Sequence, residues 1–281
     1  MPNYNLHQHS LYSDGNAQPE KYIEKATELN FSAIGFTEHS PLPFDNPFSL
    51  KQENVKIYIS EIDSLKQIYD GKIKIYRALE MDFIPGMSED FDYWANECKT
   101  DYLIGSIHLV SPGDGNPLWF TDGPDPKIYD EGIQIFFGGD VKKAVKTFFH
   151  QTNQMIETQT FDIIGHFDKI KMHNADRFFS DKDKWYRDLL DETIELIKNK
   201  NLIVEINTRG IYKKRSDKLF PDGYALKRVK YLNIPIIISS DAHKPEEINS
   251  LFDFTVDYLK KLGFKEMMGF ENNKWTHLQL K

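Results

Sequence analysis

Histidines and carboxylates recur at short, regular spacings along this 281-residue chain. His7 and His9 stand two residues apart, and the same spacing separates Asp241 from His243 near the other end. In a β-strand, residues two apart point to the same face and lie about 7 Å apart along the strand. Imidazole nitrogen together with carboxylate oxygen suits Zn²⁺, Mn²⁺ or Fe²⁺. These residue types therefore predict a metal site built on strand ends.

Comparable residues follow other strand-like runs between these two pairs. Nine side chains are candidate ligands: His7, His9, Asp14, His39, Glu80, His108, His166, Asp241 and His243. The C-terminal ends of parallel strands meet on one face of a barrel, so we expect these side chains to converge there. A catalytic zinc takes three protein ligands, and nine candidates therefore predict two or three ions, some sharing a bridging carboxylate. Asp82 and Asp168 are interpreted as residues that support the ligands or lie in loops.

The remaining histidines and the single cysteine have simpler interpretations. His150 falls in a helical stretch, His173 in a polar loop and His277 in the tail, and all three are interpreted as structural. Cys98 has no CxxC partner, which predicts a buried thiol.

Strand-like and helix-like segments must alternate to position the candidate ligands. Seven β-branched or aliphatic runs are predicted strands: 4–7, 32–37, 73–83, 102–108, 161–166, 202–208 and 234–240. Helical spacing of apolar residues lies between them, marked by Tyr22, Ile23, Ala26 and Leu29, by Ile57, Ile62, Leu65 and Ile68, and by Leu189, Leu190, Ile194 and Ile197. Such alternation predicts an α/β fold with parallel strands and right-handed crossovers. An open doubly wound sheet and a closed barrel both fit this pattern, and the ligands at the strand ends favour the barrel.

Two segments differ from crossover helices. Residues 109–139 are rich in proline and glycine and predict a long loop at the active site. Residues 174–184 predict a shorter polar connection. The chain has no internal repeat or linker that would divide it, so residues 1–281 are predicted to form a single domain.

Composition limits the partners and the compartment. The formal charge of −8 argues against non-specific nucleic-acid binding, which needs clustered Lys and Arg. One cysteine cannot form an internal disulfide. The N-terminus shows no secretory signal, and no apolar run in the sequence is long enough to predict a membrane span. A cytoplasmic protein with neither nucleic acid nor membrane as a partner is expected. The oligomeric state cannot be read from the sequence.

The runs LHQHSLYSDG, FTEHSP, ALEMDF, GSIHL, GHFDKI, EINT and ISSDAH resemble the PHP (polymerase and histidinol phosphatase) superfamily. Their order and spacing are most similar to the stand-alone histidinol-phosphatase branch, and the resemblance spans residues 6–243. It implies a distorted (β/α)7 TIM-like barrel with a trinuclear metal centre at the C-terminal ends of the strands. It also implies hydrolysis of L-histidinol phosphate, a small phosphate monoester, to L-histidinol and inorganic phosphate in histidine biosynthesis.

The resemblance also implies how the ligands are shared. The first metal would take His7, His9, Glu80 and Asp241; the second would take Glu80 as a bridge, with His108 and His166; the third would take Asp14, His39 and His243. Glu80, Asp241 and His243 are expected to be catalytic, with a metal-bridging hydroxide attacking phosphorus. Positioning and electrostatics carry most of phosphoryl transfer, so a protein nucleophile is not required.

Further contacts to the phosphate should come from cations near the strand ends. Arg209 is the best candidate because a guanidinium fork matches phosphate geometry, and Lys171 is the second. Trp119 and Phe120 would either cover an imidazole-bearing substrate or pack in the core. Two other functions stay open: a PHP enzyme acting on another phosphoester or nucleotide, and a catalytically silent module that binds metal and a partner protein.

Overall fold

The computed structural model describes residues 3–113, 115 and 117–280. Seven strands form one sheet in the order in which they occur in the chain: β1 (Tyr4–Asn5), β2 (Ala33–His39), β3 (Lys74–Asp82), β4 (Tyr102–Ser106), β7 (Ile163–Ile164), β8 (Ile203–Asn207) and β9 (Ile236–Ser239). Every neighbouring pair is parallel. All seven predicted strands are therefore present, most of them shorter than the apolar runs suggest.

The two edges of this sheet meet at their C-terminal ends. Gln8, after β1, and Ala242, after β9, form a parallel bridge, and the backbone N–H of His9 donates to the Ala242 carbonyl at 2.9 Å. The sheet is thus a nearly closed seven-stranded parallel barrel. The predicted choice of a barrel over an open sheet is confirmed.

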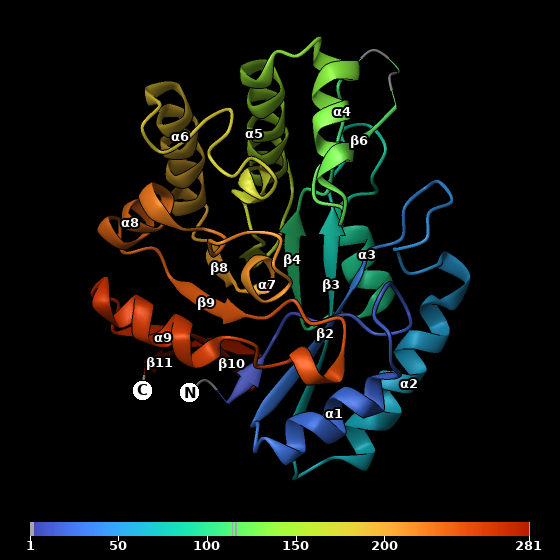
Figure 1. Cartoon of the computed structure of the whole chain (residues 1–281). Helices are drawn as coiled ribbons and strands as arrows, with labels where there is room; N and C mark the ends of the chain where they lie inside the picture. The colour runs from blue at the N-terminus through green and yellow to red at the C-terminus, as the bar shows by residue number, and fades with distance from the viewer. Residues whose placement is uncertain (1–2, 114, 116, 281) are drawn as a thin grey trace.

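Helices surround the barrel, as Figure 1 shows. Those that connect or follow the strands are α1 (Pro19–Glu28), α2 (Val55–Ile68), α3 (Phe91–Cys98), α5 (Val141–Thr158), α6 (Lys184–Asn199), α8 (Gly223–Tyr231) and α9 (Phe252–Lys261). A four-residue helix, α7 (Arg209–Tyr212), follows β8, and short 3-10 turns span Gln52–Asn54, Lys169–Lys171 and Pro245–Glu247.

The buried face of α2 differs from the predicted one. Val55, Tyr58, Ile62 and Leu65 are buried, whereas Ile57 and Ile68 are each 57% exposed. At 100° per residue, the four buried residues share one stripe, and Ile57 and Ile68 lie well to one side of it. The helix was correctly predicted, but half of its expected core face was wrong.

The segment predicted as one long loop, 109–139, contains regular structure. A short hairpin pairs β5 (Leu109–Val110) with β6 (Trp119–Phe120), and α4 (Pro126–Phe137) follows. Pro126 stands in the first turn of α4, the Asp125 carboxylate caps its N-terminus, and Gly138 ends it in the left-handed conformation. Pro126 and Gly138, two of the residues that suggested a loop, thus mark helix boundaries. Residues 114 and 116 lie outside the described residues.

A C-terminal hairpin that the sequence analysis did not predict covers the opposite end of the barrel. It pairs β10 (Glu266–Glu271) with β11 (Lys274–Gln279) and lies beside the blue first strand in Figure 1. The Tyr4 hydroxyl donates to the Met268 carbonyl, and the Tyr76 hydroxyl donates to the Phe270 carbonyl at 2.9 Å. Because Tyr4 and Tyr76 stand near the starts of β1 and β3, the hairpin closes the N-terminal end.

The interior of the barrel is filled by side chains that leave little room. The Tyr102 hydroxyl crosses it to donate to the Leu6 carbonyl at 2.6 Å. A Cβ atom at Gly35 would lie 2.0 Å from that hydroxyl oxygen, so this strand position requires glycine. Among the described residues, no helix is both long and apolar enough to cross a lipid bilayer.

Candidate metal centre

All nine predicted ligands come together at the C-terminal face of the barrel. Three groups of side chains could each hold a metal ion, because within each group the ligand atoms lie within 4.8 Å of one another. The groups are His9, Asp14, His39 and His243; His7, His9 and Asp241; and His39, Glu80 and His108. The ninth residue, His166, directs its Nε2 atom at Glu80 Oε1 from 3.0 Å. Residues at or just after the C-terminal ends of six barrel strands, β1, β2, β3, β4, β7 and β9, therefore converge on one small volume.

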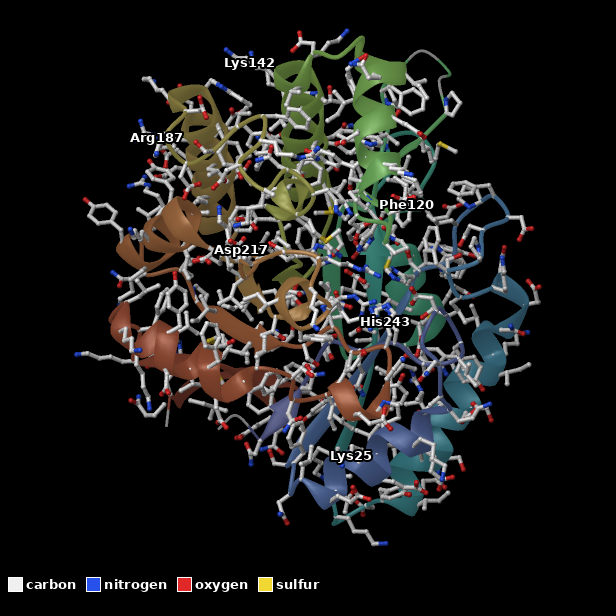
Figure 2. All side chains as sticks on the ribbon, in the orientation of Figure 1. Lys25, Phe120, Lys142, Arg187, Asp217 and His243 are labelled. Atoms are coloured by element: carbon white, nitrogen blue, oxygen red, sulfur yellow. The ribbon has the colours of Figure 1, made fainter. Side chains whose placement is uncertain are left out.

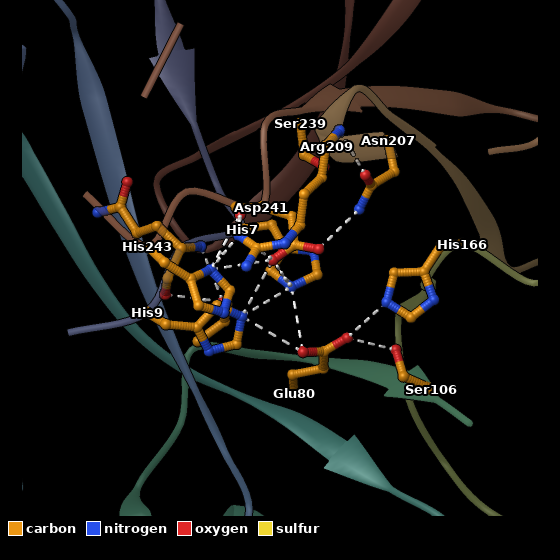
Figure 3. Close-up of polar contacts among 12 residues, drawn as sticks. His7, His9, Glu80, Ser106, His166, Asn207, Arg209, Ser239, Asp241 and His243 are labelled. Atoms are coloured by element: carbon orange, nitrogen blue, oxygen red, sulfur yellow. Dashed lines mark hydrogen bonds and ion pairs between the residues drawn. The ribbon is translucent and has the colours of Figure 1, made fainter. Parts of the chain in front are cut away.

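Glu80, at the C-terminal end of β3, lies at the middle of this cluster. Its Oε2 atom is 3.3 Å from His7 Nε2 and 3.4 Å from His9 Nε2. Its Oε1 atom is 3.0 Å from His166 Nε2 and 3.5 Å from His108 Nε2. Figure 3 shows the carboxylate between His7 and His9 on one side and His166 on the other. The two oxygens thus face separate sets of imidazoles, which is the arrangement a bridging ligand needs.

The geometric groups differ in detail from the predicted ligand sets. His9 belongs to two groups, because its Nδ1 atom is 3.8 Å from Asp14 Oδ1 while its Nε2 atom is 3.4 Å from Asp241 Oδ1. His39 is also shared, since its Nδ1 atom lies 3.3 Å from Glu80 Oε2 and its Nε2 atom 3.7 Å from Asp14 Oδ1. These two imidazoles therefore lie between the predicted sites.

Buried carboxylates behind the imidazoles hold several of them in one orientation. His7 Nδ1 lies 2.5 Å from Glu205 Oε1, and His108 Nδ1 lies 2.5 Å from Asp82 Oδ1. His39 Nδ1 is 3.2 Å from the second oxygen of Asp82. A carboxylate that accepts a hydrogen bond from Nδ1 leaves the lone pair on Nε2 free for a metal ion. The donor set therefore fits divalent metal ions, which the residues of the three groups could hold.

Glu205 is a member of this set that the sequence analysis missed. It lies inside β8, where it also accepts hydrogen bonds from the His166 backbone N–H at 2.8 Å and from the Ser239 hydroxyl. The available indication was an acid flanked by Val204 and Ile206 in the run IVEIN, because a buried carboxylate must find charged or hydrogen-bonding partners. Asp82 was expected to support the ligands, and it does so through His39 and His108.

Two candidate ligands have unusual backbone conformations. His166 has a φ of 22° and Asp241 a φ of 51°. Positive φ costs a non-glycine residue roughly 1–3 kcal/mol and persists where the surroundings fix it. For His166 the fixing contact is the Glu205 carboxylate, and the Asp241 carbonyl accepts from Arg209 Nη1 at 2.7 Å.

Two carboxylates and one imidazole of the cluster have pKa values that keep them in metal-binding forms, whereas neighbouring carboxylates raise the pKa values of His7, His9 and His108. Burial alone would raise the pKa of Glu80, but His7, His108 and His39 lower it well below its usual value. Burial opposes the ionisation of Asp241 in the same way, and Arg209 and His7 more than compensate. Burial, His9 and Arg209 lower the pKa of His243 to about 4, so this imidazole is neutral near pH 7. Ionised carboxylates and a neutral imidazole are the forms that bind metals.

A cavity of about 130 Å³ opens onto this cluster. Its floor is formed by ligands that include Glu80 and Asp241, and its wall includes Phe48, Phe120 and Asp122 together with three cations, Lys169, Arg209 and Arg215. Phe120 and His243, both labelled in Figure 2, border it from β6 and from the segment after β9. A metal cluster and cations around one small cavity can bind and polarise an anion.

The two predicted phosphate contacts have different positions. Arg209 lines the cavity, and its Nη1 atom donates to the Asp241 carbonyl and, at 2.5 Å, to His243 Nδ1. Lys171 does not line the cavity; its Nζ atom is paired with Asp168 Oδ2 at 2.5 Å. Lys169, two residues earlier, takes the place in the wall that Lys171 was expected to fill.

Trp119 and Phe120, the two aromatic residues considered for substrate contact, also differ in position. Phe120 is half-buried and parallel to Phe48, with ring planes 3° apart in angle and centroids 6.2 Å apart. Trp119 instead lies in the core, 5.3 Å from the Tyr129 ring and 5.5 Å from the Phe137 ring. Only Phe120 can therefore contact a molecule in the cavity.

None of the residues interpreted as structural lines the cavity. His150 is exposed on α5, His277 pairs with Glu266 at 2.9 Å, and His173 Nε2 lies 2.7 Å from the Gly123 carbonyl. Cys98 is buried at the end of α3, and burial raises the pKa of its thiol to about 12.

Comparisons with known proteins agree on one family. The PHP domain model matches residues 5–209. A Deinococcus radiodurans protein named "Probable histidinol-phosphatase" is 25% identical over 255 residues, covering 90% of each chain. Histidinol-phosphatase of Bacillus subtilis is 24% identical over 244 residues, covering 83% of this chain and 90% of that one. The fold is similar to that of Lactococcus lactis histidinol phosphate phosphatase complexed with Zn, L-histidinol and phosphate, with a TM-score of 0.69, 23% identity and coverage of 98% and 99%.

Proposed function

The chain belongs to the PHP domain family, and on this basis we propose that it is a metal-dependent phosphomonoesterase that hydrolyses L-histidinol phosphate. The products would be L-histidinol and inorganic phosphate, as in histidine biosynthesis. The observation that carries the proposal is the position of Glu80, whose two oxygens face separate sets of imidazoles beneath a cavity walled by cations.

We assign the ligands to two or three divalent ions, with Zn, Mn and Fe all suited to this donor set. The proposed sets are His7, His9, Glu80 and Asp241; Glu80, His108 and His166; and Asp14, His39 and His243. Bound ions of this kind lower the pKa of a water molecule towards about 7 and offset the charge of a phosphate dianion.

The protein itself supplies position and charge. The Ser106 hydroxyl donates to Glu80 Oε1 at 2.6 Å and so fixes the carboxylate that is shared between sites. Arg209 holds the Asp241 carbonyl and His243 while it borders the cavity. Among the described residues that line the cavity, none is Ser, Thr or Cys, and its aspartates and histidines are assigned to metal ions or paired with Lys169, which supports water as the nucleophile. No covalent phosphoenzyme is therefore proposed.

The wall of the cavity supports a cationic, ring-bearing leaving group. Phe48 and Phe120 offer parallel aromatic faces at one side. Asp122 Oδ2 is paired with Lys169 at 2.6 Å, whereas Asp122 Oδ1 has no hydrogen-bond donor among the described residues. L-Histidinol carries an imidazole and an ammonium group, and these complement aromatic rings and a carboxylate.

The test is a comparison of kcat/KM for phosphate release from L-histidinol phosphate and from p-nitrophenyl phosphate, on the same metal-loaded enzyme. We expect a preference of several hundredfold or more for L-histidinol phosphate, because only that leaving group carries an ammonium group for the acidic part of the wall as well as a ring for its aromatic part. Comparable slow rates on both esters would overturn the substrate assignment and leave the phosphatase assignment standing. No release from either ester would overturn both.

A further inference from the structure

Three cations border the catalytic cavity, and two of them are already paired. Lys169 Nζ lies 2.6 Å from Asp122 Oδ2, and both side chains are more than nine-tenths buried. Arg209 Nη1 donates to the Asp241 carbonyl and to His243 Nδ1, and lies 3.8 Å from Asp241 Oδ1. Each of these side chains is therefore held against a neighbouring residue of the protein.

Arg215 is different from the other two. Its side chain is half-buried and has no hydrogen bond or ion pair with any residue among those described. Asp122 and Asp241 attract it only from longer range, and burial together with Arg209 lowers its pKa. A guanidinium remains charged under all ordinary conditions, so Arg215 brings an unpaired positive charge and five N–H donors to the cavity wall.

The backbone of Arg215 is fixed although its side chain is free. After α7, Lys214 adopts a φ of 58°, which turns the chain back on itself. The backbone N–H groups of Arg215 and Ser216 then donate to the Gly210 carbonyl at 2.9 and 3.0 Å. The guanidinium is thus presented to the cavity from an anchored turn.

We propose that Arg215 is the phosphate-binding arm of the site, donating two parallel hydrogen bonds to non-bridging oxygens of the substrate phosphate and of the product phosphate. This rests on the proposed function of the cavity as a phosphatase site. A guanidinium fork matches two phosphate oxygens. The assignment also separates two roles: Arg209 positions Asp241 and His243, and Arg215 contacts the phosphate.

The test is the affinity of inorganic phosphate for the metal-loaded protein, measured by calorimetry and as competitive inhibition of p-nitrophenyl phosphate hydrolysis. Removing a charged hydrogen-bonding partner costs about 10- to 100-fold in affinity. We therefore expect Arg215→Gln to weaken phosphate binding at least tenfold and to raise KM by a similar factor. Methylguanidinium added to Arg215→Ala should restore part of the loss.

Lys214→Gln is the matched control, because it removes the same charge from the adjacent, exposed residue, which lines only a neighbouring groove. We expect it to change phosphate affinity less than threefold. Thermal unfolding and metal content of each variant show whether the fold and metal centre are intact, and Arg215→Lys offers a second folded variant that keeps the charge.

Weakening of less than tenfold in Arg215→Gln, or an equal loss in Lys214→Gln, would overturn the proposal. Failure of the proposed function is detected by the comparison of the two phosphate esters, which is a separate measurement from phosphate binding. Inorganic phosphate still reports on Arg215 if L-histidinol phosphate is not the substrate, or if no ester is hydrolysed.

Discussion

At the scale of single residues, Glu205 is not a candidate ligand, but it fixes the positions of two candidate ligands. Its carboxylate accepts from His7 Nδ1 at 2.5 Å and from the His166 backbone N–H at 2.8 Å. One buried acid therefore orients one imidazole and stabilises the unusual φ of another ligand. Such supporting carboxylates are worth about 10- to 100-fold in metal affinity or activity.

We predict that Glu205→Gln lowers metal retention or kcat by about 10- to 100-fold, because the amide keeps the shape of the side chain but loses its charge. Metal content after dialysis against a weak chelator and kcat on L-histidinol phosphate are the measurements. Glu192→Gln, on the exposed face of α6, is the control. Equal metal content and rate in the two variants would contradict the role given to Glu205.

Glu80 gives a stronger prediction because it faces imidazoles on both of its oxygens. Replacing it with alanine removes the only carboxylate placed between these groups in the described part of the chain. We expect Glu80→Ala to lose at least about 100-fold in kcat, together with bound metal. A loss of less than tenfold in turnover would contradict its assignment as the bridging residue.

The cluster could be predicted because its residue types recur at strand ends, and the structure brings all nine candidate ligands together. Spacing did not distinguish Lys169 from Lys171, which follow the same strand. Lys169 lines the cavity, whereas Lys171 pairs with Asp168 outside it. It also said nothing of Asp122 or Arg215, since their positions depend on turns that only the folded chain defines. Glu205 was recognisable only as an acid in an apolar strand.

At the scale of elements, α4 packs closely on the residue that precedes the aromatic wall. A Cβ atom at Gly132 would lie 2.1 Å from Trp119 Cδ1 and 2.2 Å from Trp119 Nε1. Glycine is normally poorer than alanine in a helix by about 1 kcal/mol. In α4 this preference is outweighed, because glycine allows the indole to lie against the helix backbone.

We therefore predict that Gly132→Ala destabilises the protein by about 1–3 kcal/mol, the usual cost of overpacking, in place of the gain that helix propensity alone suggests. Urea unfolding measures the change. KM for L-histidinol phosphate should also rise, because Trp119 is covalently joined to Phe120. Adding Trp119→Leu should relieve the clash; a stabilised Gly132→Ala variant would contradict the packing argument.

The strands of the barrel could be predicted because parallel strands buried on both faces are apolar at consecutive positions. The C-terminal hairpin was missed, although its turn has a recognisable pattern. Asn272 and Asn273 have φ values of 50° and 57°, and two such residues between strands favour a two-residue hairpin turn. In α4, the boundary residues Pro126 and Gly138 were mistaken for loop residues.

At the scale of the whole molecule, the proposed metal centre draws side chains that follow both edge strands of the barrel sheet, β1 and β9. The cluster concentrates buried acids that the nearby cations only partly balance: Glu38, Glu80, Asp82, Asp122, Glu205 and Asp241. Divalent ions would relieve their repulsion, and ligands that bind only the folded state stabilise it by mass action.

We predict that removing metal with a chelator lowers Tm by at least about 5 °C, the effect of losing one ion present at roughly 100 times its Kd. Differential scanning calorimetry of the metal-free and reloaded protein measures the shift. Glu80→Ala should lose most of this response. An unchanged Tm after verified metal removal would show that the cluster is stable without ions.

The bridge between Gln8 and Ala242 also has a consequence for biosynthesis of the chain itself. A ribosome adds about 5–20 residues per second, so roughly 10–50 s separate the emergence of His7 from that of Asp241. During this interval β1 has β2 as its sheet neighbour but not β9. The complete set of proposed ligands can therefore assemble only after Asp241 and His243 have left the ribosome.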